Sequence, residues 1–171
     1  MATKPKVNPL WIEVSFEEEG LDARALVTRT NIKGITNFAS KAYRDMTKFS
    51  RSDLIGSPHN IVRHPFMPES LFKEMWNFIS KGKHWSGLVM NLRKDGKHYW
   101  ADVHIKPIDE YGNIISDKAK IAGYLAIRRE PKRNEINDAL KLYKAMRKSE
   151  LLEKKTLREW EKELLEKIDS L

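Results

Sequence analysis

The sequence predicts an α+β fold, in which an antiparallel five-stranded sheet carries short helices on one face. Two segments near the N-terminus and three segments after residue 83 show the alternating apolar residues typical of β-strands. Between these two groups, apolar residues recur at helical spacing, so the helices are grouped and not interleaved with the strands. After Pro131 the chain becomes rich in Glu, Lys and Leu, which predicts a helical appendage.

These changes divide the chain into three parts. Residues 1–23 form an N-terminal cap segment, residues 24–131 form the main domain, and residues 132–171 form a C-terminal helix. Within the first part, LWIEVSF (10–16) alternates well enough to be a strand. Its apolar side would carry Leu10, Ile12, Val14 and Phe16.

The main domain begins with a predicted hairpin. ALVTRT (25–30) reads as a strand, NIKG (31–34) as its turn, and ITNF (35–38) as the returning strand. Both strands therefore lie next to one another in the expected sheet.

Helical segments follow the hairpin. Ser40 is placed to cap a short helix, KAYRDMTKF, and RSDLIG (51–56) adds one more helical turn that a glycine ends. A longer helix is expected over ESLFKEMWNFISKG, directly after Pro68. Its apolar stripe consists of Leu71, Phe72, Met75, Trp76 and Ile79.

The segment PHNIVRHPFMP (58–68) interrupts this regular pattern. It contains two histidines, one arginine and three prolines. Each proline removes a backbone donor and fixes φ, so the segment cannot be a helix interior or a central strand. It predicts an irregular, basic loop in the middle of the domain.

Three strands and the tail complete the fold. The strands are expected over 84–94, 98–108 and 121–129, and 134–171 is expected to be one long helix, because it contains no Gly or Pro. In that helix an apolar heptad seam is interrupted by Glu150 and Glu153, and its apolar members are Ile136, Ala139, Tyr143, Met146, Leu157, Trp160 and Leu164. Such a seam suits weak or switchable pairing, although a solvated helix or one folded back on the domain would show it too.

Strand alternation assigns side chains to the two faces of the sheet. Trp85, Gly87 and Asn91 share the face on which the helices are expected. Gly87 would leave room there for a ligand. Asn91 would place an amide where a core favours leucine, and a buried amide requires hydrogen-bond partners from a ligand or from nearby loop backbone.

The opposite face is less polar than an open sheet requires. An apolar group there, called the outer strip below, consists of Leu88, Met90, Leu92 and Trp100. We expect it to be covered by the N-terminal segment, by the C-terminal helix or by a second copy of the chain in a homodimer.

Composition excludes several classes of protein. The chain has no apolar run long enough to cross a membrane, no signal-peptide core and no cysteine, which is typical of a cytoplasmic protein. The nine basic and nine acidic residues of 134–171 cancel, so the net charge of +8 belongs to residues 1–133. No nucleotide-binding loop or nucleophile elbow occurs, and no metal site, nucleic-acid partner or enzymatic activity is expected.

These segments resemble the PAS sensor domain of bacterial aerotaxis receptors. The resemblance covers about residues 26–131. It is carried by PHNIVRHPFMP, ESLFKEMW, WSGLVMNLRKDGKHYW and IAGYLAIR, in that order and at the family's spacing. The chain departs from the family at Phe66 and Ser40, where aspartate and asparagine are usual.

The resemblance implies a PAS fold and a non-covalently bound FAD between the sheet and the helices. It implies that Arg63 and His64 supply positive charge for the pyrophosphate and that Trp85 packs against the flavin ring. It also implies that Asn91 forms a hydrogen bond with the edge of that ring. The full set of implied cofactor-binding residues is His59, Arg63, His64, Trp85, Asn91, Tyr99, Ser40 and Trp76.

The family's function is redox or energy sensing. By resemblance, this chain is expected to be the detached sensor half of a two-protein energy-taxis system, cytoplasmic and signalling by contact to a separate membrane-bound chemoreceptor. The residues leave two other hypotheses open, namely a PAS module that binds haem or another small ligand, and a ligand-free PAS adaptor.

Overall fold

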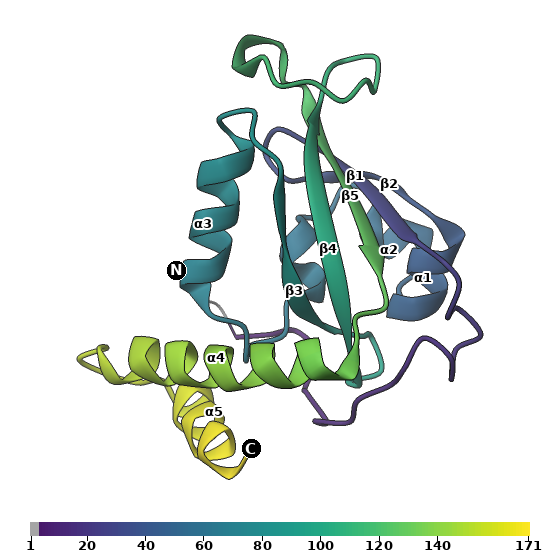
Figure 1. Ribbon diagram of the computed structural model, residues 1–171. Helices are drawn as coiled ribbons and strands as arrows, with labels where there is room; N and C mark the ends of the chain where they lie inside the picture. The colour runs from purple at the N-terminus through teal and green to yellow at the C-terminus, as the bar shows by residue number, and fades with distance from the viewer. Residues whose placement is uncertain (1–3) are drawn as a thin grey trace.

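The computed structural model describes residues 4–171 and contains one antiparallel sheet of five strands. The strand order is β2-β1-β5-β4-β3, so the hairpin predicted near the N-terminus lies at one edge and the long hairpin β3–β4 at the other (Figure 1). The strands are β1 (Leu26–Asn31), β2 (Thr36–Ala39), β3 (Trp85–Leu92), β4 (His98–Ile108) and β5 (Gly123–Arg129). The predicted five-stranded sheet is confirmed.

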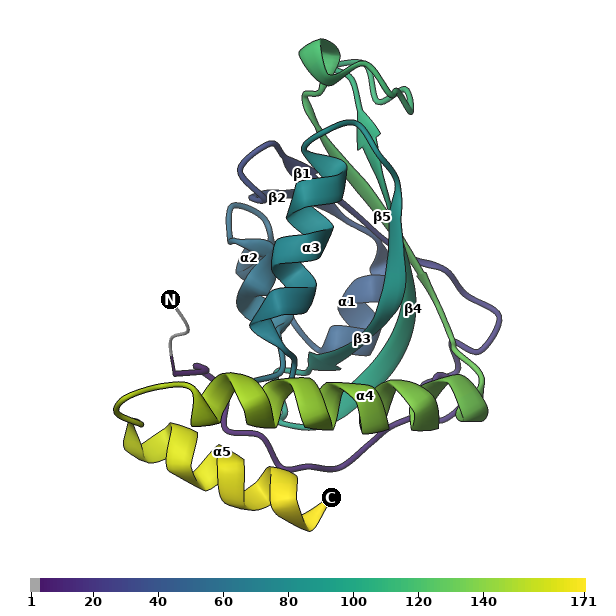
Figure 2. The same cartoon turned by 60° about the vertical axis from the view of Figure 1, so that its left-hand side comes forward.

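The helices between β2 and β3 lie together on one face of the sheet (Figure 2). They are α1 (Lys41–Thr47), α2 (Arg51–Leu54), the 3-10 turn η1 (His59–Val62) and α3 (Glu69–Ile79). A second 3-10 turn, η2 (Lys118–Lys120), precedes β5. This grouping is the predicted one, and the loop 58–68 is irregular as expected, apart from η1.

The N-terminal segment is not the strand that its alternation predicts. It makes a single parallel bridge, between Glu13 and His98, and Leu10 and Ile12 are about half exposed while Val14 and Phe16 are buried. The reason lies in β4, whose edges are occupied by β3 and, from Asp102 onward, by β5. Only the first residues of β4 have a free edge, which is too short for a full ladder.

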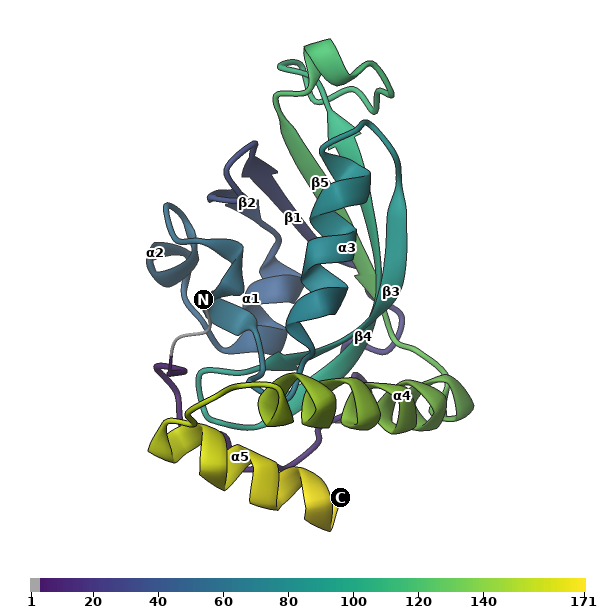
Figure 3. The ribbon, with the colours of Figure 1, turned by 90° about the vertical axis from the view of Figure 1, so that its left-hand side faces the viewer.

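The C-terminal segment forms two helices and not the single one expected. They are α4 (Arg133–Leu152) and α5 (Glu159–Ser170), which fold back on one another as a hairpin (Figure 3). An ion pair between Lys154 and Glu161 joins the turn to α5. Tyr143 and Leu164 of the heptad seam are buried inside the chain, so the seam is used for packing within the molecule.

Helix α4 and the N-terminal segment cover the outer strip. Tyr143 stacks on Trp100 with ring centroids 6.1 Å apart, and its hydroxyl donates to the Leu88 carbonyl at 2.7 Å. Met90, Leu92 and Trp100 are buried as a result. In this chain the cover is therefore intramolecular, and the strip is not available to a second copy while α4 is in place.

None of the helices among residues 4–171 is long and apolar enough to span a bilayer.

Candidate functional site

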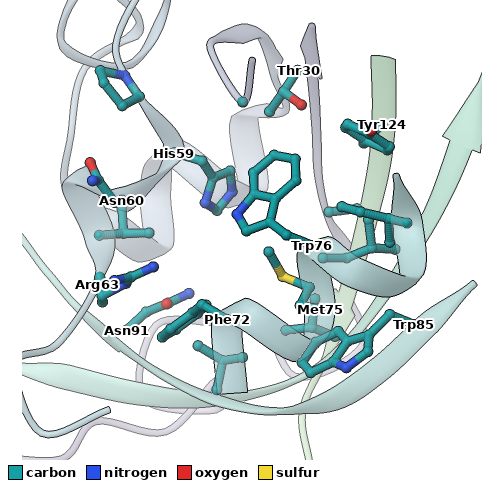
Figure 4. Close-up of a pocket in the computed structure, with 18 of the residues that line it drawn as sticks. Thr30, His59, Asn60, Arg63, Phe72, Met75, Trp76, Trp85, Asn91 and Tyr124 are labelled. Carbon is teal, nitrogen blue, oxygen red and sulfur yellow. The ribbon is translucent and has the colours of Figure 1, made fainter. Parts of the chain in front are cut away.

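A cavity of about 330 Å³ lies between α3, the loop that contains η1, and the helix-side face of the sheet (Figure 4). This size falls at the lower end of the range for small-molecule sites. The lining residues are Thr30, Lys33, Gly34, Pro58, His59, Asn60, Val62, Arg63, Phe72, Met75, Trp76, Ile79, Trp85, Val89, Asn91, Val103, Ile105, Tyr124, Ala126 and Arg128.

The walls of the cavity are mainly aromatic and aliphatic. Helix α3 contributes Phe72, Met75 and Trp76 from the apolar stripe read in the sequence. The indole of Trp76 meets the ring of Tyr124 edge-on, with centroids 5.5 Å apart. Trp85 closes the wall on the β3 side. Such walls suit a flat, apolar ligand body.

Gly87 has a different role from the one expected. A Cβ at this position would lie 2.7 Å from the indole of Trp85, and Gly87 is not among the lining residues. The glycine therefore makes room for the Trp85 ring, which folds across it, and this ring in turn lines the cavity.

Asn91 presents its amide to the cavity from β3. Its Nδ2 donates to the Tyr99 hydroxyl at 3.2 Å, and the side chain is almost fully buried. Burial raises the pKa of Tyr99 well above its usual value, so this hydroxyl stays protonated. Within residues 4–171 no group donates a hydrogen bond to the Asn91 Oδ1, which leaves an acceptor for a ligand.

Three cationic side chains line the cavity, and no aspartate or glutamate does. Lys33 is exposed at the rim, Arg63 is partly buried and Arg128 is buried. The Arg63 guanidinium lies 3.8 Å from the centroid of the Phe72 ring. Burial lowers the pKa of Arg63, and so does the repulsion from Arg147. The attraction of Glu69 and Glu150 raises it but does not outweigh the burial. The cavity as a whole favours a ligand with negative charge.

Arg128 is joined to His59 from the loop. The Nη2 of Arg128 donates to His59 Nε2 at 2.5 Å and to Thr28 Oγ1 at 3.1 Å. Burial and then the charge of Arg128 lower the pKa of His59 to about 3. His59 is therefore neutral near pH 7, accepts through Nε2 and carries its proton on Nδ1.

Helix α4 contacts the frame of the cavity from outside. Its Glu150 accepts from the backbone N–H groups of Glu69 and Ser70, both at 2.9 Å, and so caps the N-terminus of α3. Its Arg147 donates to the Pro65 carbonyl at 3.0 Å, in the same loop that supplies His59 and Arg63. The helix that forms one cavity wall is thus held by the C-terminal hairpin.

The structure brings together five of the eight expected site residues. His59, Arg63, Trp76, Trp85 and Asn91 line the cavity. Tyr99 lies directly behind Asn91 as its hydrogen-bond partner, without lining the cavity itself.

The other two expected residues lie elsewhere. The Ser40 hydroxyl accepts from the Tyr43 and Val27 backbone N–H groups, so it caps α1 and joins that helix to β1. His64 points away from the cavity, because its Nδ1 accepts from Phe66 N–H and its ring packs edge-on against Trp11 and His98. Both residues stand beside the site and not in its lining.

Phe66 does not fill the cavity. Its side chain is fully buried, meets Trp11 edge-on and is absent from the lining. The departure from the family at this position therefore changes the packing beneath the N-terminal segment and leaves the hollow behind β3 open.

Several lining residues were not expected from the sequence. Phe72 and Met75 belonged to an apolar stripe that fits a core equally well, so only the tertiary fold separates cavity wall from core. Tyr124, Ala126 and Arg128 share one face of β5, and this period of two was a usable signal, since it places an arginine on the helix-side face.

Comparison with known proteins defines the family. The family described as PAS fold matches residues 36–118. The chain is also 36% identical over 125 residues to the aerotaxis receptor of Escherichia coli (strain K12), covering 73% of this chain. The chain contains a PAS domain. The chain is also 23% identical over 108 residues, 63% of its length, to a nitrogen fixation regulatory protein of Klebsiella oxytoca. The chain spans 23% and 21% of the lengths of these relatives.

Solved structures show the same fold. A PAS domain from Colwellia psychrerythraea aligns with a TM-score of 0.54 at 22% identity, over 67% of this chain and 93% of that one. The light-oxygen-voltage domain of the blue-light photoreceptor Aureochrome1 aligns with a TM-score of 0.55 at 18% identity, over 81% of this chain and 96% of that one. A light-oxygen-voltage domain studied with a flavin analogue aligns with a TM-score of 0.57 at 18% identity, over 70% of this chain and 87% of that one. The predicted PAS fold is confirmed.

Proposed function

We propose that this chain is a PAS redox sensor that binds FAD non-covalently, has no enzymatic activity and signals by contact to a membrane-bound chemoreceptor. The observation that carries the proposal is the cavity behind β3, which combines aromatic walls, three cations and no carboxylate in a chain related to an aerotaxis receptor. The flavin studied in a related fold supports the choice of ligand class.

The residues present fit a flavin. Trp76, Trp85 and Phe72 would enclose the flat ring, and Asn91 would bond its polar edge through the free Oδ1. The cavity is too small for a whole dinucleotide, so the diphosphate would lie toward the rim. Lys33 and Arg63 would attract it there. No thiol is available for a covalent bond to the ring. A bound flavin supplies a redox-active ring whose hydrogen-bonding edge changes on reduction.

The chain itself offers a route from the cavity to its surface. Asn91 and Leu88 lie on the same strand, and the Leu88 carbonyl accepts from Tyr143 of α4. A change in the hydrogen bonds at Asn91 would shift β3 and, through this bond, α4. A displaced α4 would expose the outer strip, which is the surface we assign to a cytoplasmic partner domain of the receptor.

The absorption spectrum of the purified full chain tests the ligand class. We expect the two visible bands of a flavin and release of FAD on denaturation. A Soret band would support the haem alternative instead, although His59, the one histidine in the lining, has its Nε2 occupied by Arg128. A colourless protein that gains no flavin on reconstitution would contradict the proposal and favour a ligand-free adaptor.

Capture experiments test the signalling step. The full chain, oxidised or reduced with dithionite, would be applied to membranes that contain a chemoreceptor, with Tyr143→Phe as a variant that lacks the bond to Leu88. We expect retention to differ between the two redox states and this difference to shrink in the variant. Equal retention in both states would contradict the proposed route.

A further inference from the structure

Arg128 is a buried cation without a counter-ion. Three arginines are only 2% exposed, namely Arg93, Arg128 and Arg147. Arg93 pairs with Glu19 and Asp95, and Arg147 pairs with Glu150 and approaches Glu69. No ion pair to Arg128 exists within residues 4–171. Since moving a guanidinium out of water is costly, a buried arginine ordinarily has such a partner.

The neighbours of Arg128 do not neutralise its charge. Its Nη2 bonds to Thr28 and to the neutral His59, and its guanidinium carbon lies 4.7 Å from the centroid of the Tyr43 ring. Its Nη1 is buried and finds no hydrogen-bond partner in the described part of the chain. One full charge and the two N–H donors of Nη1 therefore remain unsatisfied.

The position of this unsatisfied arginine is informative. Of the three buried arginines, Arg128 is the one that lines the cavity. A structural arginine would be expected to resemble the other two, with carboxylates around it. The missing anion is explained if a ligand brings it.

We propose that Arg128 is the inner half of an anion-binding subsite, so that the cavity takes a ligand with a flat apolar body whose inner end is negatively charged. Arg63 and Lys33 then meet charge nearer the rim, which is a separate contact. This inference rests on the cavity being a ligand site, and not on the ligand being a flavin.

A pair of fluorescent probes that differ by one charge tests the subsite. Anilinonaphthalene sulfonate and phenylnaphthylamine share the same aromatic body, and the second lacks the sulfonate. Both would be titrated into the full chain, freed of any flavin, and allowed to displace one another. We expect the sulfonate to bind about tenfold more tightly, as a charge-assisted hydrogen bond in a buried site implies.

Variants assign the preference to Arg128. Arg128→Met should abolish the preference by weakening only the sulfonate, and Arg128→Lys should retain part of it. Arg129→Met is the matched control, because it removes the same charge from an exposed neighbour on the other face of β5 and should leave the preference unchanged. Circular dichroism and melting temperature establish that each variant folds. If Arg128→Met does not fold, the ratio of the two probe affinities in the wild-type chain still tests the proposal.

Four results would overturn the proposal. Equal binding of the two probes to the wild-type chain, or a preference that Arg128→Met keeps, would exclude the subsite while leaving a ligand cavity. A preference lost equally in Arg129→Met would reduce the effect to the basic surface of the protein. Binding of neither probe would exclude the subsite, whereas the proposed function would fall only if FAD also failed to bind.

Discussion

At the scale of single residues, the bond from the Asn91 amide to the Tyr99 hydroxyl joins the cavity to the interior of the sheet. Asn91→Ala leaves this buried hydroxyl without its donor, so the free energy of unfolding should fall by about 1–3 kcal/mol. Urea denaturation measures the change. The double variant with Tyr99→Phe should recover part of the loss, and full additivity of the two single changes would contradict a coupled pair.

The buried histidines give the protein a predictable response to acid. Burial lowers the pKa of His59 to about 3 from 6.5, and burial also lowers the pKa values of His64 and His98. The unfolded chain therefore binds more protons than the folded chain below pH 6.5, so folding stability is fully present above that pH and declines as the pH falls toward 3. Each histidine contributes a slope of up to about 1.36 kcal/mol per pH unit.

Unfolding by urea at a series of pH values measures this slope. His59→Gln should make it shallower by one histidine's share. The matched control is His84→Gln, an exposed histidine, which should leave the slope as it is. A wild-type stability that stays level from pH 6.5 down to the folded-state pKa of about 3 would contradict the neutral, buried state of these rings.

Residues differ in how far the sequence could place them. Alternation along β3 put Trp85 and Asn91 on the helix-side face, and the cavity lies there. His64 could not be placed, because the direction of a loop side chain depends on tertiary neighbours such as Trp11. The sequence placed Ser40 correctly as a helix cap, but it could not exclude the ligand contact that the resemblance implied. The period of two along β5 could have placed Arg128 on the helix-side face, but it could not show that this cation is buried without a carboxylate.

At the scale of elements, the contact between α3 and α4 links the cavity wall to the C-terminal hairpin. Burial raises the pKa of Glu150, but the backbone N–H groups of Ser70 and Glu69 outweigh this, so its pKa is lowered and it is ionised near pH 7. Glu150→Gln removes the charge at the N-terminus of α3 and weakens the ion pair to the buried Arg147, so it should lower the free energy of unfolding by about 1–3 kcal/mol.

Hydrogen exchange gives this prediction a local readout. In Glu150→Gln the amides of Glu69 and Ser70 should exchange faster, while those of β1 should not change. Glu163→Gln on the exposed side of α5 is the matched control and should leave both unaltered. If the first turn of α3 kept its protection in Glu150→Gln, the capping role would be excluded.

The hairpin α4–α5 shows where element prediction stops. The composition of 134–171 correctly indicated helix, but the break between Leu152 and Glu159 contains no Gly or Pro. It arises because Glu150 and Arg147 hold α4 on the domain while Lys154 pairs with Glu161 across the turn. Such contacts join residues far apart in the sequence, which local patterns do not encode.

At the scale of the whole molecule, α4 keeps the outer strip out of water. Tyr143→Asp places a charge against Trp100 and the Leu88 carbonyl, so α4 should detach and expose the strip. We expect the variant to self-associate in analytical ultracentrifugation at concentrations where the wild type does not. Leu142→Asp is the matched control, since Leu142 is 58% exposed on the same helix and should tolerate the change.

Self-association of both variants, or of neither, would contradict this account of the strip. An unchanged wild-type-like state in Tyr143→Asp would mean that the N-terminal segment alone suffices as cover. The PAS assignment does not depend on this result, because the family model matches residues 36–118, which lie before α4.

The most direct test of the central claim is to fill the cavity and measure FAD binding. Val89→Trp puts a large ring into the space behind β3, whereas Ser86→Trp adds the same ring on the exposed side of the same strand. In a titration followed by flavin fluorescence, we expect one FAD per chain for the wild type and for Ser86→Trp, and loss of binding in Val89→Trp. Two results would contradict a flavin site in this cavity: FAD binding to folded Val89→Trp as tight as to the wild type, or no FAD binding to any of the three proteins.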